Sequence, residues 1–248
     1  MENNQNSIYL SLVIPFFNEE RRIEKTLDNA LDFFHNTGYQ FEIILIDDGS
    51  GDRSFEIVRK YKDLHNNMIV LRNEKNFGKG YSVRRGMLQA KGEYIFFLDA
   101  DFSIFFNEID KLLIFLKQGC KIVIGSRTLP ESKILICQPF YRRLAGRIFH
   151  FFSELIIPIK VSDTQCGFKA FSKYAAKEIF SIQRLSKFCF DVEILYIAKK
   201  LGYRIKEVPI VWAHSKNNEI AFFKNGLLML MDLIAIRIWD RLGYYNRN

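Results

Sequence analysis

The 248-residue sequence has few cysteines and histidines, and their placement excludes several kinds of site. The four cysteines lie far apart without a Cys-x-x-Cys pair, so we expect neither a zinc site nor a disulfide framework, and a reducing compartment is favoured. The four histidines are equally scattered, and no Ser/His/Asp set can be assembled from them. The N-terminus, MENNQNSIYL, is polar and acidic and lacks the pattern of a signal peptide.

Several motifs for phosphate, calcium and nucleic acid are absent as well. The glycine-rich stretch NFGKGYSVRRG (76–86) fits neither the P-loop nor the dinucleotide fingerprint. An EF-hand loop starting at Asp48 would need Gly and Glu where the chain has Arg53 and Arg59. No aromatic RNA-binding signature or Cys/His finger is present, so nucleic acid is not an expected partner. The net charge of +8 then favours acidic lipid or phosphorylated substrates.

Apolar runs alternate with helical patterns through the first half of the chain. Strands are expected at 10–14, 41–46, 68–72, 94–98 and 121–125, and helices at 19–36, 52–64, 79–91 and 105–118. Continuous apolar strands separated by helices predict an α/β fold, a mostly parallel sheet with helices on both faces.

Polar motifs stand where these strands end, which is where parallel sheets bind ligands. PFFNEE follows the first strand, DDGSGD the second and DADFS the fourth. Asp99 and Asp101 project the same way from their strand, and two such carboxylates are stable together when a cation lies between them. A helix N-cap is the alternative, but it accounts for one Asp and not for the pair.

Two further motifs can be interpreted either as part of a binding site or as ordinary local structure. DDGSGD suits hydrogen bonds to a base or ribose, although its Gly-Ser-Gly also favours an ordinary turn. Lys79 and Arg84 open a helix where they could meet phosphate, helped by the helix N-terminus.

The second half is less regular and contains two apolar helical segments. A helix over 140–157 carries a polar stripe at Arg143, Arg147, His150 and Glu154 beside a broad apolar side. The segment 224–239 is apolar but contains charged residues, and it is too short for a comfortable membrane span. Each helix either lies in a membrane interface or packs its apolar side on the sheet.

Taken in order, the motifs PFFNEE, IDDGSGD, NFGKGYSVRRG, FLDADFS, GSR, DTQCGFKAF and FDVEILY resemble the family 2 glycosyltransferases of the GT-A fold. Within that family, the sequence is most similar to the dolichyl- or polyprenyl-phosphate glycosyltransferases, especially the glucosyl branch. The resemblance covers residues 8–213. It implies a Rossmann-like nucleotide-diphospho-sugar fold with a catalytic domain over 1–213. Residues 214–248 would form an amphipathic helical segment, packed on that domain or on the membrane surface.

The resemblance also implies site roles. The nucleoside of a nucleotide sugar would be held by Pro15, Phe17, Glu19, Asp47 and Asp48. Asp99 and Asp101 would serve ribose and metal, with Asp101 binding Mg²⁺ or Mn²⁺. The acceptor phosphate would be clamped by Arg127 and Arg142, with Arg143 one register away as an alternative. The acceptor-side loop would supply Asp163, Gln165 and Lys169, while Asp191 and Glu193 of FDVE match a family element without a definite role.

One region departs from the family pattern. Such relatives usually carry a Ser-Lys pair several residues after the position of Trp212, in a loop that closes over donor and acceptor. Here Ser215-Lys216 comes three residues after that Trp, and a helix-based register would instead place Asn218-Glu219 there. Either Lys216 still supplies the basic contact or the contact is lost, which leaves the choice of donor or acceptor open.

The resemblance therefore predicts an inverting, metal-dependent transferase that moves a hexose, glucose from UDP-glucose, to polyprenyl or dolichyl phosphate. A phosphate monoester has its second pKa at about 6, so it is ionised near neutral pH and needs little help from a base. That expectation agrees with the missing histidine machinery. The protein would be cytoplasmic and peripheral on the inner face of a membrane.

Other functions remain open at this point. The donor could be GDP-mannose, or the acceptor a glycan hydroxyl with Asp191 as its base. The chain could also be a catalytically idle membrane-surface scaffold of the same fold, although the intact acidic and basic motifs count against that. A sugar-1-phosphate nucleotidyltransferase would want a G-x-G-T-R-type loop where PFFNEE stands.

Overall fold

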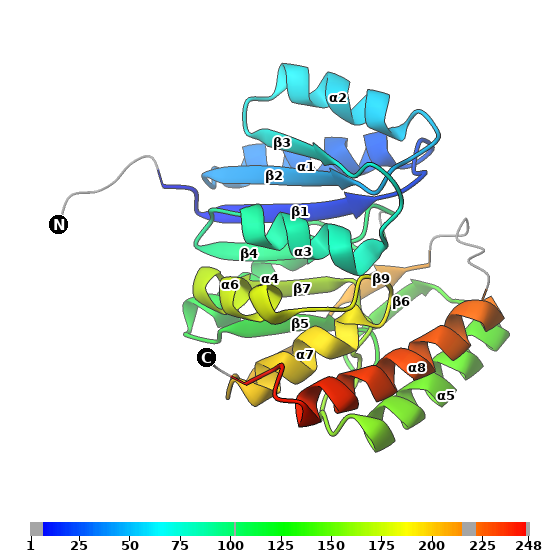
Figure 1. The fold of residues 1–248 in the computed structure, drawn as a ribbon. Helices are drawn as coiled ribbons and strands as arrows, with labels where there is room; N and C mark the ends of the chain where they lie inside the picture. The colour runs from blue at the N-terminus through cyan, green and yellow to red at the C-terminus, as the bar shows by residue number, and fades with distance from the viewer. Residues whose placement is uncertain (1–6, 102, 215–221, 247–248) are drawn as a thin grey trace.

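A seven-stranded sheet forms the centre of the protein, whose computed structural model describes residues 7–101, 103–214 and 222–246 (Figure 1). The strands lie in the order β3-β2-β1-β4-β7-β5-β8. Their bounds are β1 (Leu10–Phe16), β2 (Phe41–Asp47), β3 (Met68–Arg72), β4 (Tyr94–Leu98), β5 (Ile122–Ser126), β7 (Phe168–Ser172) and β8 (Ile205–Pro209). The five strands expected from apolar runs are confirmed.

The neighbouring strands pair in parallel except at β7, which lies antiparallel between β4 and β5. The predicted mostly parallel α/β sheet is therefore confirmed, while β7 was not expected. Its sequence contains Lys169, a residue that contradicts an apolar strand pattern and that is nevertheless fully buried.

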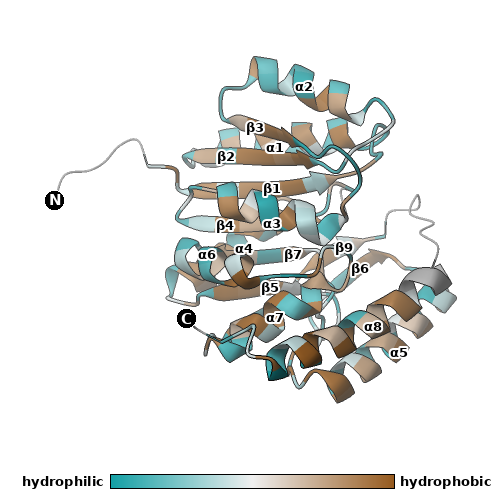
Figure 2. Cartoon of the chain, viewed as in Figure 1, coloured by the Kyte–Doolittle hydropathy of each residue, from teal (hydrophilic) through white to brown (hydrophobic). Residues whose placement is uncertain are grey.

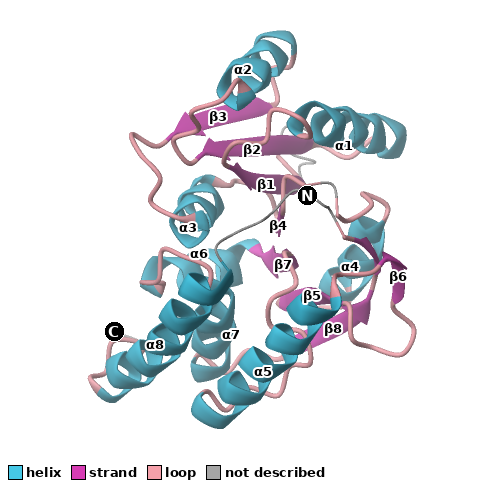
Figure 3. Ribbon diagram, turned by 90° about the vertical axis from the view of Figure 1, so that its right-hand side faces the viewer, coloured by secondary structure: helices cyan, strands magenta, loops and turns pink. Residues whose placement is uncertain are grey.

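Helices cover both faces of the sheet (Figure 3). One apolar core joins the sheet to α1 (Ile23–Thr37), α2 (Ser54–Leu64) and α4 (Glu108–Lys117). A second core joins it to α3 (Lys79–Gln89), α6 (Lys173–Ile182) and α7 (Phe190–Lys200). Helices α1 and α4 begin later than the expected 19 and 105, because the residues before them form loops at the carboxyl ends of β1 and β4.

Helices α5 (Phe140–Ile156) and α8 (Phe222–Arg241) pack against each other beside this sandwich, and α8 also contacts α7. A small parallel pair, β6 (Lys133–Ile136) and β9 (Val211–Ala213), lies near the carboxyl ends of the central strands (Figure 1). Within the described ranges, no helix is long and apolar enough to cross a membrane.

Both α5 and α8 leave apolar side chains in solvent, and the two helices are mostly brown in Figure 2. Each shows a stripe at helical spacing. We call these stripes the apolar surface: Leu144, Ile148, Phe151 and Leu155 of α5, with Leu227, Met231, Ile234 and Ile238 of α8. Helix α8 also buries Leu233 and Ile236, so it is apolar on two sides.

Candidate active site

The loops after β1 and β2 are fastened to each other by the side chains of Ser50, in the DDGSGD motif, of Ser54 just after it, and of Asn18. The backbone N–H of Asn18 donates to Ser50 Oγ over 3.0 Å, and that of Glu19 donates to Ser54 Oγ over 2.7 Å. In return, the Asn18 side chain accepts from the backbone N–H of Gly51 at 2.9 Å. Ser50 of the motif and Ser54 just after it thus hold the PFFNEE loop in place, a role that an ordinary turn would not explain.

The two acids of DDGSGD have different positions. Asp47 is fully buried, accepts from Ser50 N at 2.9 Å, and forms an ion pair with Arg72 at 3.0 Å. Asp48 accepts from the backbone N–H groups of Phe77 at 3.0 Å and Gly78 at 2.8 Å. Asp48 thereby fixes the glycine-rich loop, and of the two acids it is the one that lines a cavity.

That cavity, of about 540 Å³, opens at the carboxyl ends of β1, β2 and β4, and we call it the acidic cavity. Of the residues expected from the sequence, it gathers Pro15, Phe17, Glu19, Asp48, Lys79, Asp99 and Asp101. It also contains Asn76, Lys187 and Phe188, which the sequence did not single out. The sequence-based grouping of these loops around one site is therefore what the structure shows.

Asp99 is held from two sides. Its Oδ1 lies 2.6 Å from the ammonium Nζ of Lys79. Its Oδ2 lies against Gly167, where an added Cβ would approach it to 2.1 Å. Burial alone would lower the pKa of Lys79, but the carboxylates of Asp99 and Asp191 outweigh it and raise that pKa. Lys79 is therefore a charged partner of Asp99.

Asp101 has a different environment. Its Oδ1 accepts from the backbone N–H of Ser103 at 3.1 Å, and burial, followed by the charge of Asp99, raises its pKa. Across the described segments, no group of three His, Cys, Asp or Glu side chains is arranged to hold a metal. Two carboxylates suit Mg²⁺ or Mn²⁺ in the company of substrate phosphates, because such ions are commonly bound by one or two carboxylates plus phosphate oxygens.

A second cavity, of about 460 Å³, is rich in arginine, and we call it the basic cavity. It brings together the predicted residues Arg127, Arg142, Asp163 and Gln165. Arg143, which was the alternative to Arg142 as the residue that clamps the acceptor phosphate, lines this cavity too. The structure is therefore compatible with either arginine in that role. Arg147, His150 and Trp212 complete this wall and were not predicted as site residues.

The Arg127 guanidinium is fixed by Asp163. Asp163 accepts from Arg127 Nε at 2.7 Å, from Nη2 at 2.8 Å and from the backbone N–H at 2.9 Å. Burial would raise the pKa of Asp163, but these contacts outweigh it and lower that pKa. The GSR motif and the DTQCG motif thus form one bidentate pair.

The two cavities are close enough for their charges to meet. Burial lowers the pKa of His214, and the charge of Arg142 lowers it further while that of Asp101 opposes the change. The backbone also joins the two sites directly, because the N–H of Ala213, next to Trp212 of the basic cavity, donates to Ser103 O at 3.0 Å in the loop that carries Asp101. An acidic and a basic site thus adjoin at the same end of the sheet.

Lys169 and Asp191 lie outside both cavities. Their side chains are buried and form an ion pair, and Lys169 Nζ also donates to Cys166 O at 2.6 Å. The substrate contact expected of Lys169 and the base role considered for Asp191 are therefore not supported by their positions. They instead join the DTQCGFK strand to the FDVE helix.

Glu193 of FDVE is also structural. Its carboxylate accepts from Arg184 N at 2.9 Å, Leu185 N at 2.8 Å and Tyr245 Oη at 2.8 Å. It thus anchors the end of the described chain to the loop that precedes α7.

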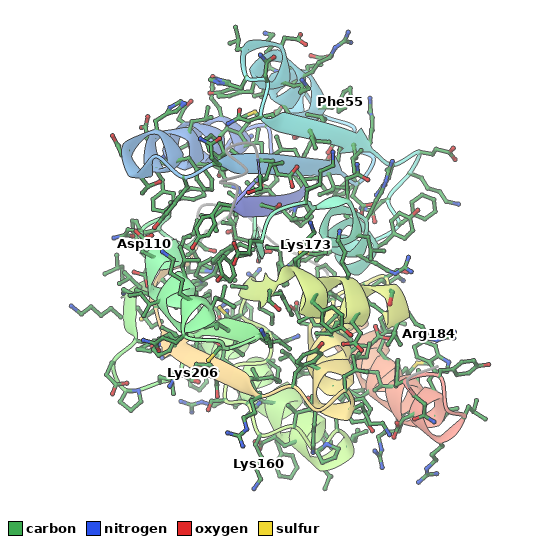
Figure 4. The ribbon with its side chains drawn as sticks, turned by 90° about the vertical axis from the view of Figure 1, so that its left-hand side faces the viewer. Phe55, Asp110, Lys160, Lys173, Arg184 and Lys206 are labelled. Atoms are coloured by element: carbon green, nitrogen blue, oxygen red, sulfur yellow. The ribbon has the colours of Figure 1, made fainter. Side chains whose placement is uncertain are left out.

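Arg84 does not reach the acidic cavity. It lies more than one turn beyond Lys79 on α3 and faces α6, where its Nε donates to Phe180 O at 2.8 Å. It lines a separate hollow with Arg184, which Figure 4 labels beside α8. The Arg184 guanidinium lies 3.9 Å from the Tyr244 ring centroid. Lys216 falls outside the described residues.

The family model for Glycosyl transferase family 2 matches residues 11–180 of the chain. A dolichyl-phosphate beta-glucosyltransferase of Dictyostelium discoideum is 34% identical over 98% of this chain and 78% of its own length. The corresponding Drosophila melanogaster and Homo sapiens proteins are 34% and 32% identical, covering 95% and 92% of this chain and 76% and 75% of their own lengths.

Solved structures agree on the fold. Mannosyl-3-phosphoglycerate synthase from Rubrobacter xylanophilus aligns with a TM-score of 0.71 at 16% identity, over 97% of this chain and 76% of that one. Glucosyl-3-phosphoglycerate synthase from Mycobacterium tuberculosis, in complex with Mn²⁺, UDP-Glc and phosphoglyceric acid, aligns with a TM-score of 0.68 at 18% identity, over 95% and 80%. The match over more than half of the sequence and the near full-length relatives show that this chain belongs to glycosyltransferase family 2, with the GT-A fold.

Proposed function

We propose that this chain transfers glucose from UDP-glucose to dolichyl or a related polyprenyl phosphate, with inversion at the anomeric carbon. The observation that carries the proposal is the acidic cavity adjoining the basic cavity at the carboxyl ends of the strands. The first suits a nucleotide sugar with its cation, and the second suits a phosphate acceptor. The names of the relatives support the same reaction.

The acidic cavity would hold the donor. Pro15, Phe17 and Asp48 line the part where the nucleoside would lie, and Asp99 and Asp101 line the part for ribose and diphosphate. Asp101 is the first candidate to hold Mg²⁺ or Mn²⁺, with Asp99 beside it. Such an ion would supply neutralisation of the leaving nucleoside diphosphate.

The basic cavity would orient the acceptor. Arg127 and Arg142 would hold the phosphate so that one of its oxygens faces the anomeric carbon, and Asp163 keeps the Arg127 guanidinium in one orientation. The acceptor is already ionised near neutral pH, since its second pKa is about 6. Positioning and charge therefore supply most of the catalysis.

A glycan hydroxyl acceptor receives less support. It would need a general base, and Asp191 was the candidate. The Asp191 carboxylate is buried and ion-paired with Lys169, and it lines neither the acidic nor the basic cavity. A phosphate acceptor requires no such group.

The apolar surface of α5 and α8 would rest on the membrane that holds the lipid acceptor. Helix α5 also contributes Arg142, Arg143 and Arg147 to the basic cavity, so it would connect the bilayer to the acceptor site. Basic side chains beside an apolar surface favour anionic membrane interfaces. We propose a peripheral position on the cytoplasmic face, with 1–213 as the catalytic domain and 214–248 as the segment that completes this surface.

The test is a transfer assay with purified protein. Radiolabelled UDP- and GDP-sugars would be offered with dolichyl phosphate and Mg²⁺ or Mn²⁺, using Asp101→Asn and, as a matched control on the exposed side of α2, Asp63→Asn. We expect label from UDP-glucose in the lipid, dependence on the metal, and loss in Asp101→Asn alone. Transfer from GDP-mannose instead would show that the proposed donor, UDP-glucose, is wrong. Binding of the donor without any labelled lipid would show that the proposed acceptor, a lipid phosphate, is wrong.

A further inference from the structure

Lys79 is fixed at the start of α3. Gly78 before it has φ of 104°, and a Cβ there would lie 2.4 Å from Ser186 O. The next residue but one, Tyr81, donates its backbone N–H to the same Ser186 O at 3.0 Å. This first turn is thus clamped by the loop before α7, and the Lys79 side chain is only 22% exposed.

The two acids of DADFS consequently have unequal partners. Asp99 has Lys79 Nζ at 2.6 Å on one oxygen and Gly167 packed against the other. Asp101 accepts a backbone hydrogen bond from Ser103, and in the described part of the chain no basic side chain forms an ion pair with it. Both carboxylates stand in the same cavity, and Lys79 is in contact with Asp99, whereas Asp101 is influenced by the charge of Arg22 without an ion pair to it.

We propose that Lys79 is a built-in counter-ion of Asp99 that makes metal binding depend on the nucleotide. With Lys79 in place, the pair Asp99–Lys79 is neutral, and of these two acids Asp101 is the one that offers a divalent cation a carboxylate without an ion-paired base among the described residues. Such a site is weak by itself, because a divalent cation requires several anionic or neutral oxygen ligands. The diphosphate would supply the remaining ligands, so metal and nucleotide would bind cooperatively.

The inference rests on the proposed function, since it assumes a metal and a nucleoside diphosphate in the acidic cavity. Lys79 acts in it as a positioning residue, through Asp99. The sequence instead predicted that Lys79 contacts the diphosphate itself, and this alternative has a different experimental consequence. In that case removing Lys79 would weaken UDP binding and would leave the affinity for the metal alone unchanged.

The experiment measures Mn²⁺ binding to the full chain by electron paramagnetic resonance, with and without UDP, in wild type, Lys79→Met and Lys60→Met. Lys60 is an exposed residue of α2 and controls for the loss of one positive charge. We expect UDP to tighten Mn²⁺ binding to the wild type and to Lys60→Met. Lys79→Met should bind Mn²⁺ without UDP at least about tenfold more tightly, because one repelling charge is gone.

A second pair of variants keeps the test decisive if Lys79→Met does not fold. With UDP present, Asp101→Asn should abolish Mn²⁺ binding, whereas Asp99→Asn, which keeps the Asp101 carboxylate but leaves the Lys79 ammonium unpaired, should weaken it clearly less. Equal losses in these two variants, or unchanged nucleotide-free affinity in a folded Lys79→Met, would overturn the inference while leaving the proposed function intact. If the wild type binds no Mn²⁺ even with UDP, the metal-dependent function and this inference both fail.

Discussion

Gly167 leaves room for Asp99: a Cβ at residue 167 would come within 2.1 Å of Asp99 Oδ2. The two residues belong to the DTQCG and DADFS motifs, which are far apart in the sequence. Asp99 follows β4 and Gly167 precedes β7, and these strands pair with each other. A glycine of the acceptor-side loop thus sets the space available to Asp99, one of the two carboxylates on the donor side.

Gly167→Ala should therefore displace Asp99. We expect an overpacking cost of about 1–3 kcal/mol in the free energy of unfolding and a loss of transfer activity of about 100-fold, since small misplacements of site groups are that costly. Urea unfolding and the transfer rate measure the two effects. Gly226→Ala, where an added Cβ meets nothing within 4 Å, should leave the rate unchanged. Wild-type activity in Gly167→Ala would contradict this prediction.

The buried Lys169–Asp191 pair should be important for stability. Asp191→Asn or Lys169→Met alone leaves a buried charge without its partner, which costs about 3–5 kcal/mol in the free energy of unfolding. The double variant should recover much of that loss. Denaturant unfolding of all four proteins gives the coupling energy. A stable but inactive Asp191→Asn would instead restore Asp191 as a candidate base.

Asp163 should make stability depend on pH. Its folded-state pKa is below the unfolded value of about 3.9, so the Arg127–Asp163 pair stabilises the protein above that pH. The stabilisation is lost as the pH falls through the folded-state pKa. Asp163→Asn should therefore be less stable than wild type at pH 7, with the difference narrowing below pH of about 4. Thermal unfolding at pH 7, 5, 4 and 3 measures this, and a difference independent of pH would disprove it.

Arg127 should require its planar guanidinium as well as its charge. Arg127→Lys retains the positive charge but cannot form the bidentate pair with Asp163. We expect a raised KM for the lipid phosphate and a lower kcat, while the affinity for UDP stays unchanged. Steady-state kinetics and UDP titration separate these quantities. An unchanged KM for the lipid phosphate would show that Arg127 does not contribute to binding of the acceptor.

The apolar surface should bind anionic vesicles. Ile148→Glu and Ile234→Glu each replace an exposed apolar side chain whose burial in lipid would contribute about 1.5–3 kcal/mol, so each should weaken vesicle binding by tenfold or more. Ile114→Glu, at an exposed position of α4, is the matched control. Sedimentation with phosphatidylserine vesicles measures binding. Equal effects of all three changes would argue against this surface.

Much of the fold follows from local pattern. The five apolar runs became strands, and the polar motifs after β1, β2 and β4 line one cavity, because parallel strands bring their carboxyl ends to one edge. Strand β7 was missed since Lys169 interrupts its apolar pattern, and only the distant Asp191 makes its burial possible. Arg84 was misplaced because the sequence did not show that its side of α3 faces α6.

The sequence by itself determined the class of fold, the strands and the family, since hydrophobic periodicity and ordered motifs are local properties of the chain. The tertiary structure decided which acid meets which base. Lys79 forms an ion pair with Asp99, Arg127 with Asp163, and Lys169 with Asp191. All three pairs join residues that are not neighbours in the sequence, and all three depend on how strands and loops are brought together. Buried charges require partners, but no local pattern states which partner the fold will supply.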